Sequence, residues 1–133
     1  MIAAVTFLAS SFSALAQDGL KDYYFVWNGD QNLVANFTSE SQWTRFGNGH
    51  ESECDLEVNR AAAVAGTRDV VLGSGRKVFV PNMSRAQAHD LWVACMRSKG
   101  WEYYATEQDV VARRNQLRSQ NIQSTAMAFS KSF

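Results

Sequence analysis

Two cysteines constrain the fold of this chain more than any other feature. Cys54 and Cys95 are the only cysteines among its 133 residues. In an oxidising compartment, two cysteines with none left over predict one intramolecular disulfide. Closing a loop of this length contributes about 4 kcal/mol by the chain-entropy estimate, a large share of a small domain's stability. The interpretation of the pair therefore depends on the compartment.

The N-terminus predicts an exported protein. Residues 2–12 form an apolar run, and Ala14-Leu15-Ala16 ahead of Gln17 satisfies the small-x-small rule for signal-peptidase cleavage. No Lys or Arg precedes the run, so a retained anchor is the alternative to a cleaved signal peptide for residues 1–16. The run is shorter than the roughly 20 apolar residues of a membrane span. We predict localisation to the periplasm or the outer envelope.

Cys95 lies in a segment with the pattern of a capped helix. Ser84 and Gln87 have the spacing of a capping box. Behind them one helical face carries apolar residues, namely Ala88, Leu91, Trp92, Cys95 and Met96. Gly100 suits the left-handed position that ends a helix, and we expect Trp101 after it to pack on Met96.

Cys54 lies in a second helical segment. Ser52 is predicted as its cap, with Asp55 as the third helical residue, and Gly66 as its end. Its apolar face carries Cys54, Val58, Ala61, Ala62 and Ala65. Cys54 would lie at the start of this helix and Cys95 near the end of the other. In an antiparallel pair these two ends are neighbours, so the disulfide fits.

Two stretches have the pattern of β-hairpins. A strong hairpin signal is Asn-Gly between aromatic and β-branched runs. The first stretch has this pattern, with Asn28-Gly29 between Tyr23–Trp27 and Asp30–Phe37. Within the first run, Tyr23, Phe25 and Trp27 share one face of the strand, and Tyr24 and Val26 the other. A second hairpin is predicted for residues 69–72 and 76–80 around Gly73-Ser74-Gly75.

The C-terminal part predicts one more helix and a tail. The helix starts at Thr106, and its apolar stripe is thin. Residues 121–133 are polar with scattered apolar side chains, which predicts a flexible or partner-bound tail. Residues 17–120 then form the exported globular domain. The fold class is α+β, a small single domain with a disulfide-linked antiparallel helix pair, one or two β-hairpins and a C-terminal helix or arm.

Catalytic patterns are weak in this sequence. Gly73-Ser74-Gly75-Arg76-Lys77 lacks the spacing of a phosphate loop, and a hairpin turn is the better interpretation. His50, Glu51, Glu53 and Cys54 match no standard zinc spacing. His89 beside Asp90 could suggest a catalytic relay, but the sequence has no Gly-x-Ser-x-Gly motif to supply a nucleophilic serine. A solvated helix face is the better interpretation of these two residues. We predict no catalytic residue, no metal and no cofactor.

The charges cancel overall but are unevenly distributed. Thirteen basic and thirteen acidic residues leave no net charge to favour nucleic acid or an acidic membrane. Residues 18–57 carry eight acids and two bases, a net of −6, and residues 58–101 carry seven bases and two acids, a net of +5. Either the two halves of one domain face each other, or the subunit is dipolar and stacks head to tail.

Aromatic residues are concentrated near the N-terminus. They are Tyr23, Tyr24, Phe25, Trp27, Phe37, Trp43 and Phe46. Core filling and an exposed binding patch are equally open as explanations. The predicted interaction surface comprises aromatic residues of this group together with residues of the C-terminal part, namely Tyr23, Phe25, Trp27, Trp43, Phe46, Arg113, Arg114, Phe129 and Phe133.

The strings around the cysteines resemble a known pattern. "ECDLEV" at residues 53–58 with "CMRSKGWEY" at residues 95–103 is similar to small exported proteins and lipoproteins of Gram-negative bacteria. In that group, a Cys-Met-x-x-Lys-Gly-aromatic string ends the second helix of a disulfide-linked pair. The resemblance implies compartment and local fold, and no activity. This chain lacks the lipidated cysteine of the lipoprotein members.

Two functions from different classes remain open. The first is a non-enzymatic structural or accessory subunit of a periplasmic or envelope-associated assembly, whose partners are other protein subunits or further copies of the chain. The second is a small exported ligand-binding or inhibitor module that uses the aromatic hairpin. An enzyme ranks third because no nucleophile and base stand out. Nucleic acid is not expected as a partner, and membrane contact is expected only through residues 1–16 if they are retained.

Overall fold

A three-stranded antiparallel sheet and the helices packed on it form the body of the molecule. The computed structural model describes residues 20–133. Along the chain the elements are β1 (Lys21–Trp27), α2 (Gln31–Val34), α3 (Glu40–Ala65), β2 (Thr67–Val71), β3 (Lys77–Pro81), α4 (Arg85–Lys99), β4 (Trp101–Tyr104), α5 (Glu107–Ser119) and β5 (Ala126–Lys131). The sheet has the order β4-β1-β5, and β2 pairs with β3 in a separate sheet. The predicted α+β class is confirmed.

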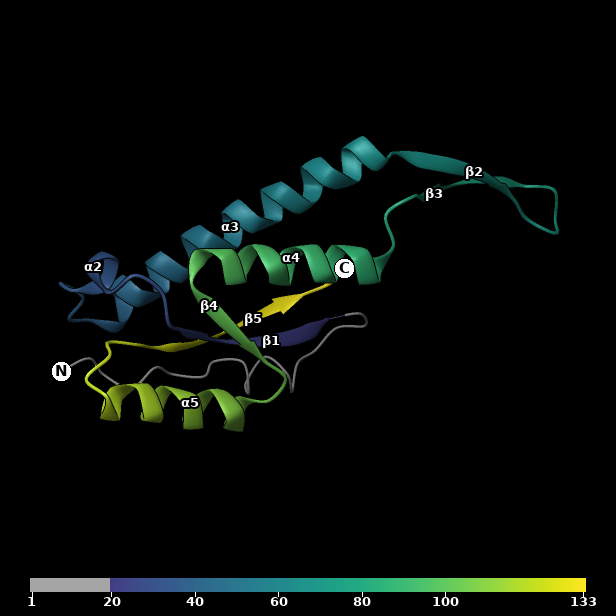
Figure 1. Cartoon of the computed structure of the whole chain (residues 1–133). Coiled ribbons are helices and arrows are strands. Elements are labelled where there is room, and N and C mark those ends of the chain that lie inside the picture. Colours follow the sequence, from purple (N-terminus) through teal and green to yellow (C-terminus); the bar gives the residue numbers. More distant parts are fainter. Residues whose placement is uncertain (1–19) are drawn as a thin grey trace.

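Helices cover both faces of the central sheet. α3 and α4 lie antiparallel on one face, and α5 lies on the other (Figure 1). Tyr23, Phe25 and Trp27 of β1 belong to the core under α3 and α4, whereas Val26 packs with Val110 of α5. The alternation predicted for β1 is confirmed, and it allows this strand to serve two cores at once.

The disulfide between Cys54 and Cys95 is confirmed and joins α3 to α4. Both cysteines are buried, and their Cα atoms lie 5.6 Å apart, within the usual range for a disulfide. Because thiols stay reduced in the cytosol, the bond indicates an oxidising, exported environment.

The predicted ends of α4 are confirmed. Ser84 accepts a hydrogen bond from the backbone N–H of Gln87, whose side chain accepts one from the N–H of Ser84. Gly100 follows the helix with φ of +114°, in the left-handed region. Trp101 is the first residue of β4, and its ring lies edge-on to that of Trp27 at 5.3 Å between centroids.

α3 begins earlier than predicted. Ser39 is its cap, in a reciprocal capping box with Gln42, and the prediction of a start at Ser52 is wrong. The predicted end at Gly66 is confirmed. Cys54 therefore lies in the middle of a 26-residue helix.

Glycine explains why the longer helix is hard to predict. Gly47 lies inside α3, where glycine costs about 1 kcal/mol relative to alanine. A Cβ atom at Gly47 would lie 2.3 Å from the Sδ of Met127 in β5. The glycine lets the helix approach the sheet, and this packing outweighs its low helix propensity.

The predicted hairpin around Asn28-Gly29 is wrong. β1 pairs with β4 and β5, which lie far away in the sequence, and not with residues 30–37. Asp30 instead caps the short helix α2 by accepting from the N–H of Asn32. A Cβ atom at Gly29 would lie 2.5 Å from the Trp27 ring and 3.1 Å from the Cα of Gly100. Gly29 therefore serves close packing between two chain segments.

The tail is part of the sheet, which corrects the prediction of a flexible or partner-bound segment over residues 121–133. β5 pairs along almost the whole of β1, from Lys21 opposite Lys131 to Val26 opposite Ala126. Met127 and Phe129 are buried in the core under α3 and α4. The strand was missed because its other face carries alanines, and because its partner lies about 100 residues away.

Residues 1–16, predicted as a signal peptide or anchor, lie outside the described residues. Within residues 20–133, no helix is long and apolar enough to cross a membrane.

Candidate interaction site

The second predicted hairpin is confirmed, and it protrudes from the body of the molecule. β2 and β3 extend from the far ends of α3 and α4, away from the central sheet (Figure 1). We call residues 66–82 the protruding hairpin. Its strands pair from Thr67 opposite Pro81 to Val71 opposite Lys77. The Gly73-Ser74-Gly75 segment forms the turn, with Gly75 at φ of +84°.

Hydrogen bonds fasten the base of this hairpin to the helix ends. The side-chain amide of Asn82 donates to the carbonyl of Ala65 at 2.7 Å, and its backbone N–H donates to Gly66 at 2.9 Å. Arg68 Nη1 reaches the carbonyl of Pro81 at 3.4 Å. The helix pair, itself closed by the disulfide, therefore holds the hairpin at a defined base.

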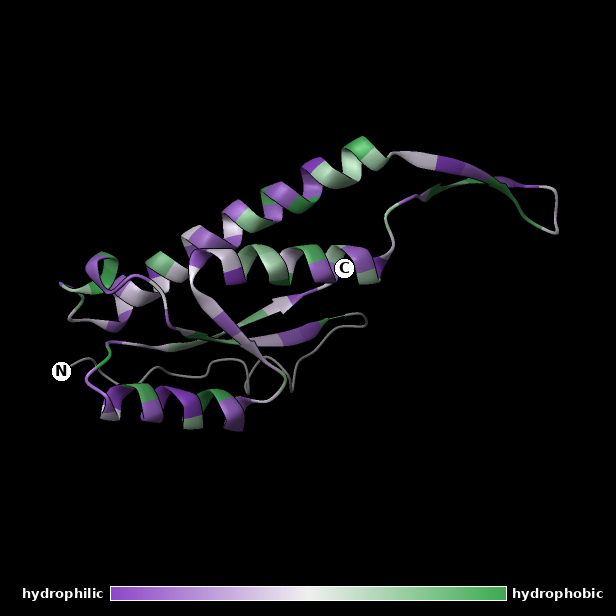
Figure 2. Cartoon of the chain, viewed as in Figure 1, coloured by the Kyte–Doolittle hydropathy of each residue, from purple (hydrophilic) through white to green (hydrophobic). Residues whose placement is uncertain are grey.

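Apolar side chains of the hairpin are open to solvent. None of the residues in β2 and β3 is buried. Phe79 is 73% exposed and Val71 is 65% exposed, and these two belong to the same face. Val64, in the last turn of α3 beside the hairpin, is 90% exposed. Figure 2 shows this concentration as green at the end of α3 and along β3.

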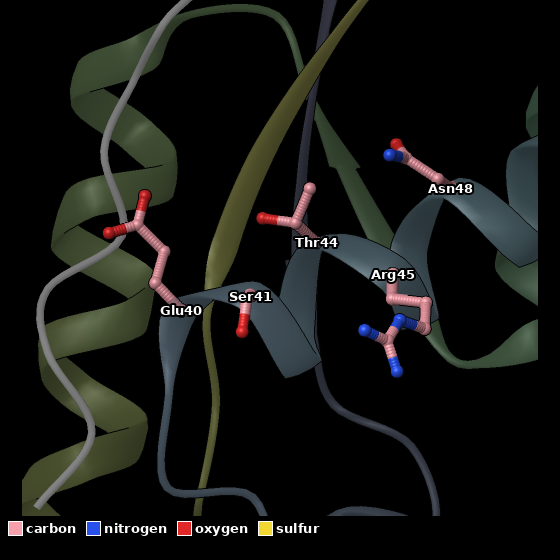
Figure 3. A pocket seen from close by; sticks show the side chains of 5 residues that line it. All are labelled: Glu40, Ser41, Thr44, Arg45 and Asn48. Atoms are coloured by element: carbon pink, nitrogen blue, oxygen red, sulfur yellow. The ribbon is translucent and has the colours of Figure 1, made fainter.

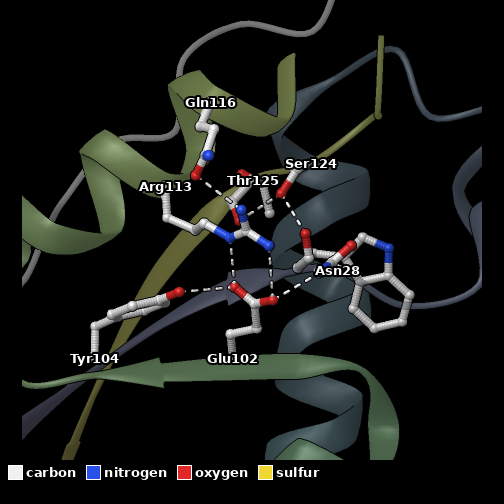
Figure 4. Close-up of polar contacts among 8 residues, drawn as sticks. Asn28, Glu102, Tyr104, Arg113, Gln116, Ser124 and Thr125 are labelled. Carbon is white, nitrogen blue, oxygen red and sulfur yellow. Dashed lines mark hydrogen bonds and ion pairs between the residues drawn. The ribbon is translucent and has the colours of Figure 1, made fainter. Parts of the chain in front are cut away.

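A polar cluster lies between β4 and α5 (Figure 4). The carboxylate of Glu102 accepts from Arg113 Nε at 2.9 Å, from Asn28 Nδ2 at 2.8 Å and from the hydroxyl of Tyr104 at 2.9 Å. Burial raises the pKa of Glu102, but the hydrogen bonds from Arg113, Asn28 and Tyr104 outweigh it and hold that pKa below its ordinary value. Because its donors converge on one carboxylate, the cluster ties α5 to the sheet.

His50 lies among aromatic rings between α3 and the sheet. The indole N–H of Trp101 donates to Nδ1 of His50 at 2.9 Å, so this nitrogen carries no proton. Burial lowers the pKa of His50, against a smaller raising effect of Glu53. The hydrogen bond and the burial both favour the neutral ring.

A shallow polar hollow of about 630 Å³ lies beside the first turns of α3 (Figure 3). Its lining residues are Glu40, Ser41, Thr44, Arg45 and Asn48. All of them belong to one helix, so the described chain offers a single wall and no converging set of groups.

Four residues of the predicted aromatic surface are buried. Tyr23, Phe25, Trp27 and Trp43 have exposed fractions of 3% or less. They form the core under α3 and α4 with Trp92 of α4. Of the two explanations for the aromatic cluster, core filling is therefore correct for these side chains, and they offer no binding face.

The remaining residues of the predicted surface are engaged within the fold. Phe46 is half-buried and packs edge-on against Trp27. Arg113 is held by Glu102, and Arg114 is only 8% exposed, where burial lowers the pKa of its guanidinium.

Both phenylalanines near the C-terminus also pack on the core. Phe129 is buried, and the ring of Phe133 packs on those of Tyr23 and Trp92. The structure therefore brings the aromatic members of the predicted surface together in the core and not on an exposed face.

Three carboxylates of the acidic half pair with two lysines, one from the basic half and one from the tail. Lys131 Nζ lies 2.7 Å from Glu51 and 2.8 Å from Asp55, and Lys99 lies 2.9 Å from Glu53. This arrangement fits the expectation that the two halves face each other. It also uses carboxylates that had been considered as metal ligands. Within residues 20–133, no three His, Cys, Asp or Glu side chains are grouped to hold a metal ion.

The sequence predicted the protruding hairpin as a secondary-structure element but not as a candidate interaction site. The available signal was its apolar pattern. Val70-Val71-Leu72 and Val78-Phe79-Val80 are continuous apolar runs, which are typical of strands covered on both faces.

Comparisons with protein-family profiles, with curated proteins and with solved structures find no match. The function therefore has to be inferred from the residues of this chain.

Proposed function

We propose that this protein is a non-enzymatic structural or accessory subunit of a periplasmic or envelope-associated assembly. The observation that carries the proposal is the protruding hairpin with its uncovered apolar side chains. An isolated two-stranded hairpin is at best marginally stable in water. Exposed apolar side chains gathered in one place are typical of protein interaction sites.

Compartment and shape support the same function. The buried disulfide indicates an oxidising environment, for which the periplasm or the outer envelope is the proposed location. The body of the molecule supplies a rigid base, and the hairpin projects from it (Figure 1). A projecting element on a rigid body suits a subunit that contacts neighbours.

The ligand-binding alternative depends on an exposed aromatic hairpin, which is not found within residues 20–133. β1 is the central strand of the sheet, and its aromatic side chains are buried. The polar cluster around Glu102 does not favour an enzyme either. Its polar groups hydrogen-bond to one another and hold α5 against the sheet.

Intact mass spectrometry of protein purified without reductant from the envelope of its source tests the proposal. Under denaturing conditions we expect a chain without residues 1–16 and two hydrogens lighter than the reduced form. Under native conditions we expect other polypeptides to remain bound. A processed, oxidised chain that is always a lone monomer at its physiological concentration would contradict the proposed function.

A further inference from the structure

The protruding hairpin presents apolar side chains on both of its faces. The register places Val70 and Val78 opposite each other on one face, and Val71 lies diagonally across from Phe79 on the other. Val71 and Phe79 are exposed, Val70 and Val78 are half-buried, and none of the four is fully buried. A partner that touches one face would leave the apolar side chains of the other in water, so the pattern favours a partner with two walls.

The outer edge of β3 is protected against strand addition. Backbone hydrogen bonds join Leu72 to Arg76 and Gly66 to Asn82, so the even-numbered residues form the hydrogen-bonded pairs between the two strands. The backbone N–H and C=O groups of the odd-numbered residues therefore point away from the partner strand. On the outer edge of β3 these include Lys77 and Pro81. Lysine and proline on an edge strand oppose pairing with another strand, and Pro81 has no N–H to offer. Strand addition at this edge is therefore disfavoured, which leaves the faces of the hairpin as the candidate docking surface.

The charge of the hairpin is positive. Residues 66–82 contain Arg68, Arg76 and Lys77 against Asp69, so three bases and one acid leave a net of +2. Asp69 lies 3.9 Å from Lys77 in an exposed pair that solvent screens. Arg60 and Arg85 add positive charge on the adjoining helices. A second copy of the same hairpin would bring like charges together, whereas a partner with carboxylates is complementary.

The tip of the hairpin argues against insertion into a lipid bilayer. Gly73, Ser74, Gly75 and Arg76 form the end that would enter first, and none of them is apolar. The apolar side chains lie behind the tip, along the length of both strands. A flat membrane surface would meet the polar tip or only one face.

We infer that the protruding hairpin docks in a two-walled apolar slot of another protein, and that carboxylates around this slot meet Arg68, Arg76 and Lys77. The inference rests on the proposed function and names the surface and the chemistry of the partner. The disulfide-linked helix pair holds the hairpin outward for this contact. The turn at Gly73-Ser74-Gly75 lies at the far end of the slot.

Photocrosslinking in cells of the protein's own source tests this inference. p-Benzoylphenylalanine is placed at Val78 in one full-length variant and at Phe79 in another. These neighbours point to opposite faces of the hairpin. We expect both variants to crosslink to different segments of one other protein, with Asp or Glu in the attached peptides. The probe at Leu33, which is 55% exposed on the body, should crosslink at least about tenfold less.

Charge reversal tests the electrostatic part. Arg76→Glu with Lys77→Glu should lower the crosslinking yield from Phe79 by about fivefold, whereas Arg45→Glu on α3 should leave it unchanged. The melting temperature of each variant should stay within about 2 °C of the parent, which shows that the variants are folded.

Several outcomes would overturn the inference. Crosslinks to a second copy of the chain, to lipid, or from one face only would do so. So would a crosslinking yield that charge reversal leaves unchanged, or no crosslink at all. If native mass still shows bound subunits in any of these cases, the proposed function survives and only the docking surface is wrong. If native mass shows a lone monomer, the proposed function itself fails.

Discussion

Two glycines show at the residue scale how close packing restricts a position. Gly29 and Gly100 lie back to back, since a Cβ atom at Gly100 would be 2.8 Å from the Cα of Gly29 and 2.7 Å from the Trp27 ring. Gly100 also has φ of +114°, which side chains rarely adopt. Space and backbone conformation therefore both require glycine there.

Gly100→Ala should lower the free energy of unfolding by more than about 1 kcal/mol, because the contacts add to the cost of the left-handed backbone. Urea denaturation measures the change. Gly49→Ala is the matched control, because Gly49 lies inside α3 with nothing within 4 Å of an added Cβ atom. That control should be neutral or stabilising by up to about 1 kcal/mol. Equal effects of the two substitutions would contradict the packing described for Gly100.

His50 should make the stability depend on pH. Its pKa in the folded chain is lowered, so the unfolded chain takes up a proton first as the pH falls below the ordinary value of about 6.5. The free energy of unfolding should therefore be highest above pH 6.5 and should decrease as the pH falls through the folded pKa.

His50→Gln is the variant that isolates this effect. Its amide oxygen can still accept from the indole N–H of Trp101, but the side chain does not titrate. Urea denaturation between about pH 7.5 and pH 5 should show a smaller decrease for the variant than for the parent. Identical pH profiles would mean that His50 has the same pKa in both states.

The disulfide acts at the scale of elements, because it joins the middle of α3 to the last turns of α4. Replacing both cysteines with alanine should lower the free energy of unfolding by about 4 kcal/mol under oxidising conditions. In reductant, the difference in the free energy of unfolding between the parent and the variant should largely disappear. If reductant left the unfolding of the parent unchanged, the bond would have no stabilising role.

Glu102 and Arg113 connect β4 to α5 in the same way, without a covalent bond. Glu102→Gln should lower the free energy of unfolding at pH 7 by about 1–3 kcal/mol, because it removes the charge on which three donors converge. The difference should shrink as the pH falls through the lowered pKa of Glu102, since the parent then becomes protonated as well.

A double-mutant cycle with Arg113→Gln measures the coupling between the two side chains. The coupling should be about 1 kcal/mol, because both side chains are half-buried and joined by a charge-assisted hydrogen bond. Additive effects of the two substitutions would show that Glu102 acts through its other donors.

Association belongs to the scale of the whole molecule. Phe79→Ser should weaken binding to the native assembly by about tenfold or more, because Phe79 is the most exposed large hydrophobic side chain of the protruding hairpin. It should leave the unfolding of the isolated chain nearly unchanged, because Phe79 buries little surface there. Native mass spectrometry at a series of concentrations measures the occupancy.

Leu33→Ser is the control for this comparison. Leu33 is 55% exposed on α2, away from the hairpin, so its replacement removes exposed apolar surface without touching the proposed site. Its occupancy curve should match that of the parent. A similar loss in both variants would indicate a general effect of surface apolarity.

Local features of the fold could be predicted because their causes are local. The cap at Ser84, the helix end at Gly100, the alternation in β1 and the hairpin turn at Gly73-Ser74-Gly75 each depend on a few neighbouring residues. The disulfide could be predicted because the chain has only two cysteines.

The sequence by itself determined where several helices and strands end and which cysteines pair, because capping, turn chemistry and a single cysteine pair leave few alternatives. Only the tertiary structure decided that β1 pairs with β4 and β5, that α3 continues through Gly47, and that the predicted aromatic surface is core. These outcomes depend on contacts between residues far apart in the chain. Only the tertiary structure decided that the protruding hairpin is exposed, because no local pattern indicates whether another element will cover it.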